Sequence, residues 1–241
     1  MPEVAVPAPA LTVFYGGTFD PVHCGHLGVA RHARDRLDAT IRLMPAADPP
    51  HRAPPGADAV HRARMLDLAV AGEPRLTVDR RELQRATPSY SIDTLHEVRG
   101  ELGPKAPVAL LVGADSLLGL SGWKDWQALF GLAHFIVAER PGVDIGRSVL
   151  PGPLAAFLAD RWTDAVAALH QVPAGRVLRL RQPLQHGSAT EIRARVAAGQ
   201  SLDGLVPPAV AAYIARTTCM QPGTHPRHGY NPPPPVPRVR T

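Results

Sequence analysis

The stretch of this 241-residue chain that most constrains its fold is VFYGGTFDPVHCGHL, residues 13–27. A run of β-branched and aromatic residues at Leu11–Tyr15 predicts a strand. Gly16 and Gly17 end that strand, because paired glycines allow backbone angles and close approaches that a Cβ would prevent. Apolar residues at near-helical spacing then predict a helix over His26–Leu37. The order is therefore strand, glycine turn, histidine pair and helix.

The start of this helix is suited to an anion. A helix that follows a parallel strand begins at the carboxyl end of the sheet, where α/β folds bind ligands. Its first N–H groups have no partner within the helix and carry a partial positive charge, which favours a phosphate. His23 and His26 lie three residues apart here, so both rings can face one anion, and Gly25 leaves the backbone between them open. The pattern indicates stabilisation of charge on a phosphoryl group rather than nucleophilic attack.

Predicted strands and helices alternate along most of the chain. The strands are expected at Leu11–Tyr15, Thr40–Pro45, Leu76–Val78, Val108–Gly113, His134–Ala138 and Arg176–Leu180. The helices are expected at His26–Leu37, Asp58–Ala71, Ser91–Leu102, Trp123–Phe130, Leu154–Ala168, Ala189–Ala198 and Pro208–Ala215. This alternation predicts an α/β fold with a Rossmann-like, doubly wound, mostly parallel sheet and helices on both faces.

The two ends of the chain differ in composition from its middle. Residues 1–10 are rich in proline and alanine, and residues 217–241 form a Pro-rich tail; together the ends hold 10 of the 27 prolines. We expect both ends to be disordered and residues 11–216 to form one domain. The tail is either a solvated appendage or a docking peptide for another protein.

The composition limits the cellular compartment and the classes of binding partner that we expect for this chain. The chain has no run of 18 apolar residues and no basic N-terminal region followed by an apolar block, so neither a membrane-spanning helix nor a secretory signal is expected. Cys24 and Cys219 are too few for a disulfide framework, which favours the cytoplasm. The net charge of +5 is compatible with nucleic acid, but residues 217–241 hold three arginines and no acid, which leaves the middle only mildly basic.

The residues GGTFDPVHCGH resemble the signature of the HxGH nucleotidyltransferases, the adenylyl- and cytidylyltransferases related to class I aminoacyl-tRNA synthetases. The resemblance implies that His23 and His26 are catalytic and hold phosphate oxygens of ATP. It also implies that the preceding turn binds ATP through Gly16, Gly17, Thr18 and Phe19.

A second motif reads GSATEIRARVAAG and begins at Gly187. Ser188 and Glu191 have the spacing of a capping box at a helix start. Local structure does not account for Thr190 and Arg193, which suit the β- and γ-phosphates of a nucleoside triphosphate. The segment resembles the ISATxIR element of the same family, with Gly187 in place of the usual isoleucine. The resemblance implies that Ser188, Thr190 and Arg193 bind ATP.

The strand expected at Val108–Gly113 runs directly into Ala-Asp-Ser. A carboxylate just past a strand end can accept hydrogen bonds from ribose hydroxyls, and Asp115 can equally cap the next helix. The segment resembles the GxDS element of the family, which implies that Gly113 and Asp115 bind ATP.

Four further segments resemble elements of bacterial nicotinate-nucleotide adenylyltransferases. DPPHR resembles a PPHR loop, although Ala46 or Ala47 stands where that family often has asparagine. TPSYSIDT resembles the element that recognises the nicotinate ring, and its Ser91 is also predicted to be a helix N-cap. GWKDW resembles an element that lines the nicotinate pocket, in which Trp123 would stack on the ligand. ERPG resembles an element whose arginine reaches phosphate. The acceptor-binding residues implied are His51, Arg52, Tyr90, Ser91, Trp123, Lys124 and Arg140.

The resemblance covers about residues 11–216, with the motifs in order. It implies transfer of the adenylyl group of ATP to nicotinate mononucleotide, which gives deamido-NAD and pyrophosphate by direct in-line attack. Mg²⁺ is expected to arrive with ATP and to be held mainly by the nucleotide, and no protein ligand to a metal is predicted. The expected partners are the two substrates, without nucleic acid or membrane, and the sequence is compatible with a homo-oligomer.

Three alternatives stay open on the sequence. A sister HxGH adenylyltransferase would act on phosphopantetheine or another phosphorylated acceptor. A nucleic-acid-binding protein would use the basic charge, although no basic strand with interleaved aromatic residues is seen. An inactive homologue would act as an interaction module through its Pro-rich tail, against which the intact His23, His26, Thr190 and Arg193 argue.

Overall fold

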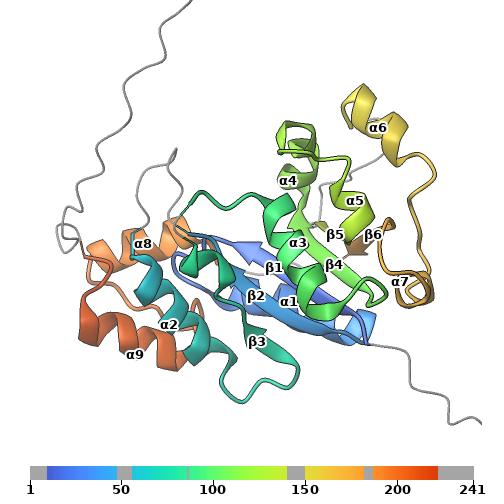
Figure 1. Cartoon of the computed structure of the whole chain (residues 1–241). Coiled ribbons are helices and arrows are strands. Elements are labelled where there is room, and N and C mark those ends of the chain that lie inside the picture. The colour runs from blue at the N-terminus through green and yellow to red at the C-terminus, as the bar shows by residue number, and fades with distance from the viewer. Residues whose placement is uncertain (1–9, 48–55, 86, 140–149, 182–186, 222–241) are drawn as a thin grey trace, which may run out of the picture.

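A parallel sheet of six strands forms the centre of the computed structural model, which describes residues 10–47, 56–85, 87–139, 150–181 and 187–221. The strands are β1 (Thr12–Gly17), β2 (Thr40–Pro45), β3 (Leu76–Val78), β4 (Val108–Gly113), β5 (His134–Glu139) and β6 (Val177–Arg181). Their order is β3-β2-β1-β4-β5-β6, and every pairing is parallel (Figure 1). The chain therefore winds outward in both directions from β1, and the predicted fold class is confirmed.

Helices cover both faces of this sheet (Figure 1). They are α1 (Cys24–Leu37), α2 (Ala59–Val70), α3 (Ser91–Leu102), α4 (Ala114–Leu118), α5 (Leu129–Leu132), α6 (Gly152–Leu158), α7 (Ala167–Gln171), α8 (Ala189–Ala197) and α9 (Pro208–Thr217). Two short 3-10 turns are also present: η1 (Arg81–Gln84) lies between β3 and α3, and η2 (Leu120–Gly122) lies between α4 and α5.

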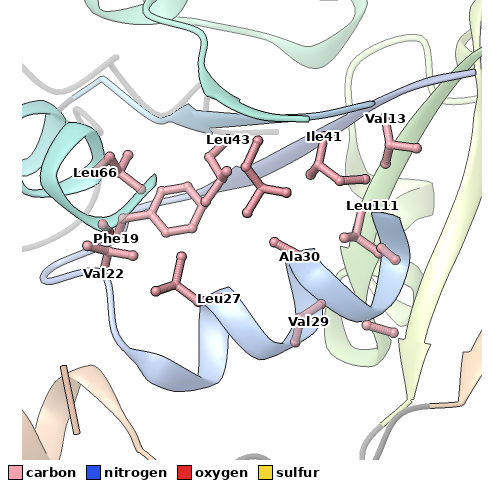
Figure 2. Packing of buried hydrophobic residues seen from close by; sticks show 14 of the residues in the cluster. Val13, Phe19, Val22, Leu27, Val29, Ala30, Ile41, Leu43, Leu66 and Leu111 are labelled. Atoms are coloured by element: carbon pink, nitrogen blue, oxygen red, sulfur yellow. The ribbon is translucent and has the colours of Figure 1, made fainter. Parts of the chain in front are cut away.

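Strand side chains alternate between two apolar layers, as expected for strands buried on both faces. Val13 points into a layer formed with α1, α2, α8 and α9, while the adjacent Phe14 points into a layer formed with α3 to α6. In the first layer, Leu27 of α1 and Leu66 of α2 approach the buried ring of Phe19 (Figure 2). This packing fixes the start of α1 against the carboxyl end of β1.

Two predicted helices are wrong, for tertiary reasons. Of the helix expected at Trp123–Phe130, only Leu129 and Phe130 are helical, as the start of α5, because Asp125 adopts a left-handed φ of 49° and the chain turns before α5 begins. The helix expected at Leu154–Ala168 is divided into α6 and α7. Between them, Trp162 forms a bridge with Val177 of β6, so pairing at the sheet edge overrides the helical pattern.

The chain ends were expected to be disordered, and residues 1–9 and 222–241 lie outside the described part of the structure. The boundary expected at residue 216 falls inside α9, which continues to Thr217. Beyond it, Cys219 and Met220 are buried in the first apolar layer. The packed part of the chain therefore extends a few residues past the expected boundary.

Candidate active site

Two histidines form the N-terminus of α1. His23 is the N-cap, and its Nδ1 accepts a hydrogen bond from the backbone N–H of His26 at 3.3 Å. The backbone N–H of His23 donates to Nδ1 of His26, also at 3.3 Å. The two rings stack with centroids 3.6 Å apart. A reciprocal capping box made of two imidazoles therefore holds the pair at the positive end of the helix.

The reciprocal cap determines which ring nitrogen carries the proton. A nitrogen that accepts a hydrogen bond uses its lone pair, so each neutral imidazole carries its proton on Nε2. His23 and His26 are thus both oriented as Nε2–H donors, with Nδ1 held at the backbone. Stabilisation of an oxyanion requires donors of this kind, fixed before the charge develops.

The glycine turn packs its aromatic residue beneath the histidines. Phe19 has a φ of 51°, is 2% exposed, and has its ring centroid 5.0 Å from that of His26. A Cβ on Gly17 would lie 3.0 Å from the Phe19 ring, which accounts for glycine at that position. Gly16 is exposed, and a Cβ there would have nothing within 4 Å. Phe19, which was expected to bind ATP, has a buried side chain whose ring packs against that of His26. The backbone carbonyl of Thr18 accepts a hydrogen bond from the guanidinium of Arg62 at 2.7 Å.

The N-terminus of α8 lies close to the histidine pair. Gly187 has a φ of 112°, and a Cβ there would lie 3.6 Å from Nδ1 of His23. Ser188 is the N-cap and accepts from the backbone N–H of Glu191 at 3.1 Å. The predicted capping box is only half formed, because the Glu191 carboxylate pairs with Arg195 at 3.1 Å.

Thr190 and Arg193 contact each other, and Arg193 also contacts the turn between β1 and α1. Its Nη2 donates to Oγ1 of Thr190 at 3.2 Å, and its Nη1 donates to the backbone carbonyl of Asp20 at 2.7 Å. Ile192 is fully buried and anchors α8 to the core. Two motifs separated by more than 160 residues therefore form one site.

Sequence reasoning missed Asp20. This carboxylate is 5% exposed and accepts from the backbone N–H groups of Gly56 and Ala57, the latter at 2.8 Å. Its Oδ2 lies 3.4 Å from Nη1 of Arg193. The one signal in the sequence was an acid inside GGTFDP, which a turn explains equally well.

Gly113 and Asp115 lie at the carboxyl end of the strand beside β1. Tyr15 is paired with Leu111, so β1 and β4 end at the same edge of the sheet. Gly113 is the N-cap of α4, and Asp115 lies in its first turn and is exposed. Because the sheet winds in opposite directions from β1 and β4, this edge is the crevice where such folds bind nucleotides.

Two acceptor motifs contact each other above this edge. The Nζ of Lys124 lies 4.9 Å from the ring centroid of Tyr90 and 3.5 Å from a carboxylate oxygen of Asp93. Trp123 is partly buried against the second apolar layer. Ser91 is not the N-cap: Tyr90 occupies that position without a side-chain cap bond, and Ser91 is the first helical residue because its backbone is already helical. Of the other predicted residues, His51, Arg52 and Arg140 lie outside the described residues.

A partly buried polar cluster supports the start of α3. The Glu82 carboxylate accepts from the hydroxyl of Thr94 at 2.9 Å, and Arg85 donates to the same hydroxyl at 3.1 Å. Arg85 also pairs with Glu97 at 2.7 Å. Burial raises the pKa of Glu82, although Thr94 and Arg85 oppose the shift.

Comparison with known proteins identifies the family. Residues 14–195 match the family model described as cytidylyltransferase-like. A probable nicotinate-nucleotide adenylyltransferase from Stenotrophomonas maltophilia (strain K279a) is 58% identical over 211 residues, which cover 86% of this chain and 95% of the relative. Another from Cronobacter sakazakii (strain ATCC BAA-894) is 45% identical over 215 residues, covering 89% of this chain and 97% of the relative. The chain belongs to the nicotinate-nucleotide adenylyltransferase family.

Solved structures agree with the fold of this adenylyltransferase. The Plasmodium falciparum nicotinic acid mononucleotide adenylyltransferase complexed with NaAD aligns with a TM-score of 0.65 at 16% identity, covering 88% of this chain and 97% of that one. The same enzyme complexed with APC gives a TM-score of 0.63 at 16% identity, with the same coverage. The family predicted from the motifs is confirmed by the sequence relatives, and the structures support the fold.

Metal-binding clusters and membrane-spanning helices are both absent from the described residues of the adenylyltransferase. Within them, no three or more His, Cys, Asp or Glu side chains are grouped so that they could hold a metal ion. No helix in this part of the chain is both long and apolar enough to cross a membrane.

Proposed function

We propose that this adenylyltransferase transfers the adenylyl group of ATP to nicotinate mononucleotide and releases deamido-NAD and pyrophosphate. The observation that carries the proposal is the stacked histidine pair, whose Nδ1 atoms are held by backbone N–H groups so that both rings are oriented as Nε2–H donors. Relatives named for the same activity support the choice of substrates.

The chemistry is a direct displacement at the α-phosphorus. An oxygen of the mononucleotide phosphate forms the new P–O bond in line, while the bond from the α-phosphorus to the α–β bridging oxygen breaks and pyrophosphate leaves. Negative charge grows on the α-phosphate and bridging oxygens. The Nε2–H groups of His23 and His26 stabilise that charge, together with the positive end of α1. No side chain forms a covalent bond with the substrate, so catalysis is positioning and charge stabilisation.

The N-terminal turn of α8 binds the triphosphate end of ATP. Thr190 and Arg193 contact each other and face the first turn of the chain, so they hold the β- and γ-phosphates and steady the departing pyrophosphate. Ser188 adds the cap of this helix start. Gly113 and Asp115, at the end of the neighbouring strand, bind the nucleoside part. Mg²⁺ enters as part of the ATP substrate and offsets the phosphate charge.

The acceptor lies toward the start of α3. The pyridine ring of nicotinate mononucleotide packs against Tyr90 and Trp123, and the N–H groups at Ser91 attract the ring carboxylate together with Lys124. A nearby cation and a helix N-terminus favour a carboxylate over a neutral amide. The protein acts in the cytoplasm, in keeping with the free thiols of Cys24 and Cys219.

The test is pyrophosphate release from ATP and Mg²⁺ by the full chain, with three acceptors in parallel: nicotinate mononucleotide, nicotinamide mononucleotide and phosphopantetheine. We expect release to be strongest with nicotinate mononucleotide. Release with phosphopantetheine alone would leave the histidine pair in place but replace the acceptor. No release with any acceptor would overturn the proposal and favour an inactive homologue.

A further inference from the structure

We propose that Asp20 is the positioning residue for Arg193 and that it thereby sets the affinity of the enzyme for the triphosphate end of ATP. The inference rests on the proposed function in one respect, namely that Arg193 binds the β- and γ-phosphates. It adds a residue that lies in the turn after β1 and that was assigned no role from the sequence.

The guanidinium of Arg193 is held from two sides. Nη1 donates to the backbone carbonyl of Asp20 at 2.7 Å and lies 3.4 Å from its carboxylate, while Nη2 donates to Thr190 at 3.2 Å. The side chain of Arg193 is still 37% exposed, so part of its donor set faces outward. An arginine that is already ordered loses less conformational entropy when it binds an anion than one that moves freely.

The Asp20 carboxylate is itself fixed. Its side chain is 6% exposed, and its two oxygens accept from the consecutive backbone N–H groups of Gly56 and Ala57, just before α2. A buried carboxylate with two backbone donors and one arginine cannot change orientation without losing a hydrogen bond. Asp20 is therefore a rigid point from which Arg193 can be aimed.

Close packing at Gly56 supports this interpretation. A Cβ built on Gly56 would lie 2.6 Å from Cδ of Arg193 and 3.2 Å from Oδ2 of Asp20. The aliphatic part of Arg193 therefore runs directly over the Gly56 backbone, where only a residue without a side chain leaves room. Carboxylate, glycine and guanidinium form one unit, which we call the arginine seat: Asp20, Gly56 and Arg193.

A purely structural role for Asp20 predicts different results from a positioning role. If Asp20 only stabilised the fold, its loss would weaken binding of both substrates in parallel with a loss of thermal stability. If it positions Arg193, its loss acts on ATP and leaves the acceptor unaffected, because the acceptor residues lie at the start of α3.

The experiment measures the dissociation constant of MgATP by calorimetry, and KM for each substrate by pyrophosphate release, with the full chain. For Asp20→Asn we expect ATP binding about tenfold weaker, the size of a lost charge-assisted hydrogen bond. The KM for nicotinate mononucleotide should stay within about twofold. Asp58→Asn is the matched control, because Asp58 also accepts a backbone N–H at the start of α2, but from His61 and outside the arginine seat. We expect its ATP affinity to stay within about twofold of wild type.

Two more variants keep the proposal testable if Asp20→Asn folds poorly. Gly56→Ala keeps the carboxylate but displaces Arg193, and we expect it to weaken ATP binding in the same direction. Arg193→Gln removes the residue that Asp20 is proposed to aim. In that background, Asp20→Asn should change ATP affinity by less than about twofold, because the two effects act through one group.

The outcomes separate this proposal from the proposed function. Wild-type release of pyrophosphate together with unchanged ATP affinity in both Asp20→Asn and Gly56→Ala would overturn the arginine seat alone. Full additivity of Asp20→Asn with Arg193→Gln, or equal losses of affinity for ATP and acceptor, would also overturn it. The variants could instead change ATP affinity as expected while the wild-type chain releases no pyrophosphate. That result would support the arginine seat and overturn the proposed function.

Discussion

The starts of α1 and α3 lie at the same edge of the sheet but are built in different ways. At α1, the N-cap His23 is 8% exposed and is locked by a reciprocal backbone cap. At α3, the N-cap Tyr90 is 46% exposed and makes no side-chain cap bond. Its contact with Lys124 is a cation–π approach at 4.9 Å between exposed side chains. We call the first the phosphate side and the second the acceptor side.

This difference matches what each side is proposed to do. Charge develops on the phosphates during the reaction, and donors stabilise it best when they are fixed in advance. Selection of the acceptor needs only a complementary surface, and contacts between exposed side chains are worth little in the free protein. We therefore expect changes on the phosphate side to lower turnover, and changes on the acceptor side to raise the KM of one substrate.

The largest effect is expected from His26→Ala. It removes one Nε2–H donor and half of the reciprocal cap, so turnover at saturating substrate should fall by at least about 10²-fold, measured as pyrophosphate release. Loss of the cap should cost only about 1 kcal/mol of unfolding free energy. His32→Ala is the control: this histidine is on the same helix, but its ring contacts the carbonyl of Arg181 at 2.9 Å. Near-wild-type turnover of His26→Ala would remove the histidine pair from the mechanism.

Gly187→Ala should have the next largest effect. The φ of 112° is unfavourable for any residue with a Cβ, so we expect a loss of about 1–3 kcal/mol in unfolding free energy by thermal or chemical denaturation. Turnover should fall as well, because this backbone lies beside His23. Gly199→Ala alters the other end of α8, where φ is 64°, and should reduce stability alone. Equal turnover in the two variants would show that strain at Gly187 does not reach the histidines.

The acceptor side is tested by Tyr90→Ala. Loss of the ring should raise the KM for nicotinate mononucleotide by about fivefold, the size of one aromatic contact. The KM for ATP and the melting temperature should hardly change, because the Tyr90 side chain is exposed and makes no cap hydrogen bond. Tyr90→Phe keeps the ring and should behave as wild type. A parallel rise in the KM for ATP would end the division of the site into two sides.

The sheet was predictable because its strands are buried on both faces. Continuous apolar runs such as Val108–Gly113 have few alternatives as structures, and the six expected strands agree with the observed ones to within one residue at most ends. The helices after Trp123 and after Leu154 were less predictable. Their apolar spacing was helical, but a left-handed Asp125 and a bridge from Trp162 to β6 decide the local structure.

The phosphate side was predictable only in part, for a related reason. His23 and His26 lie three residues apart, so local spacing alone brings them together. Asp20 acquires its role from Gly56 and Arg193, which are 36 and 173 residues away. Spacing in a sequence predicts contacts between residues that are close along the chain. Contacts between distant residues form only when the chain folds, so no spacing in the sequence predicts them. The same argument applies to Glu82, whose partner Thr94 lies on a different element.

Glu82 offers the smallest test of the comparison, because it supports the acceptor side from within the protein. Burial raises its pKa above the value in an unfolded chain, about 4.3. The protonated form is then relatively favoured in the fold, so the contribution of Glu82 to stability is largest below the unfolded pKa and is lost as pH rises through the folded pKa. Replacement by glutamine removes this titration while keeping an acceptor for the Thr94 hydroxyl.

The expected result is a difference in unfolding free energy between wild type and Glu82→Gln that moves in favour of wild type as pH is lowered from about 7 toward about 4. Urea denaturation at each pH measures it. Glu97→Gln is the control, because it removes the exposed partner of Arg85 and leaves the partly buried Glu82 carboxylate in place. A difference that is independent of pH would mean that the carboxylate is as well solvated in the fold as in the unfolded chain. The acceptor side would then gain no support from a desolvated carboxylate, and its contrast with the phosphate side would be sharper than the structure indicates.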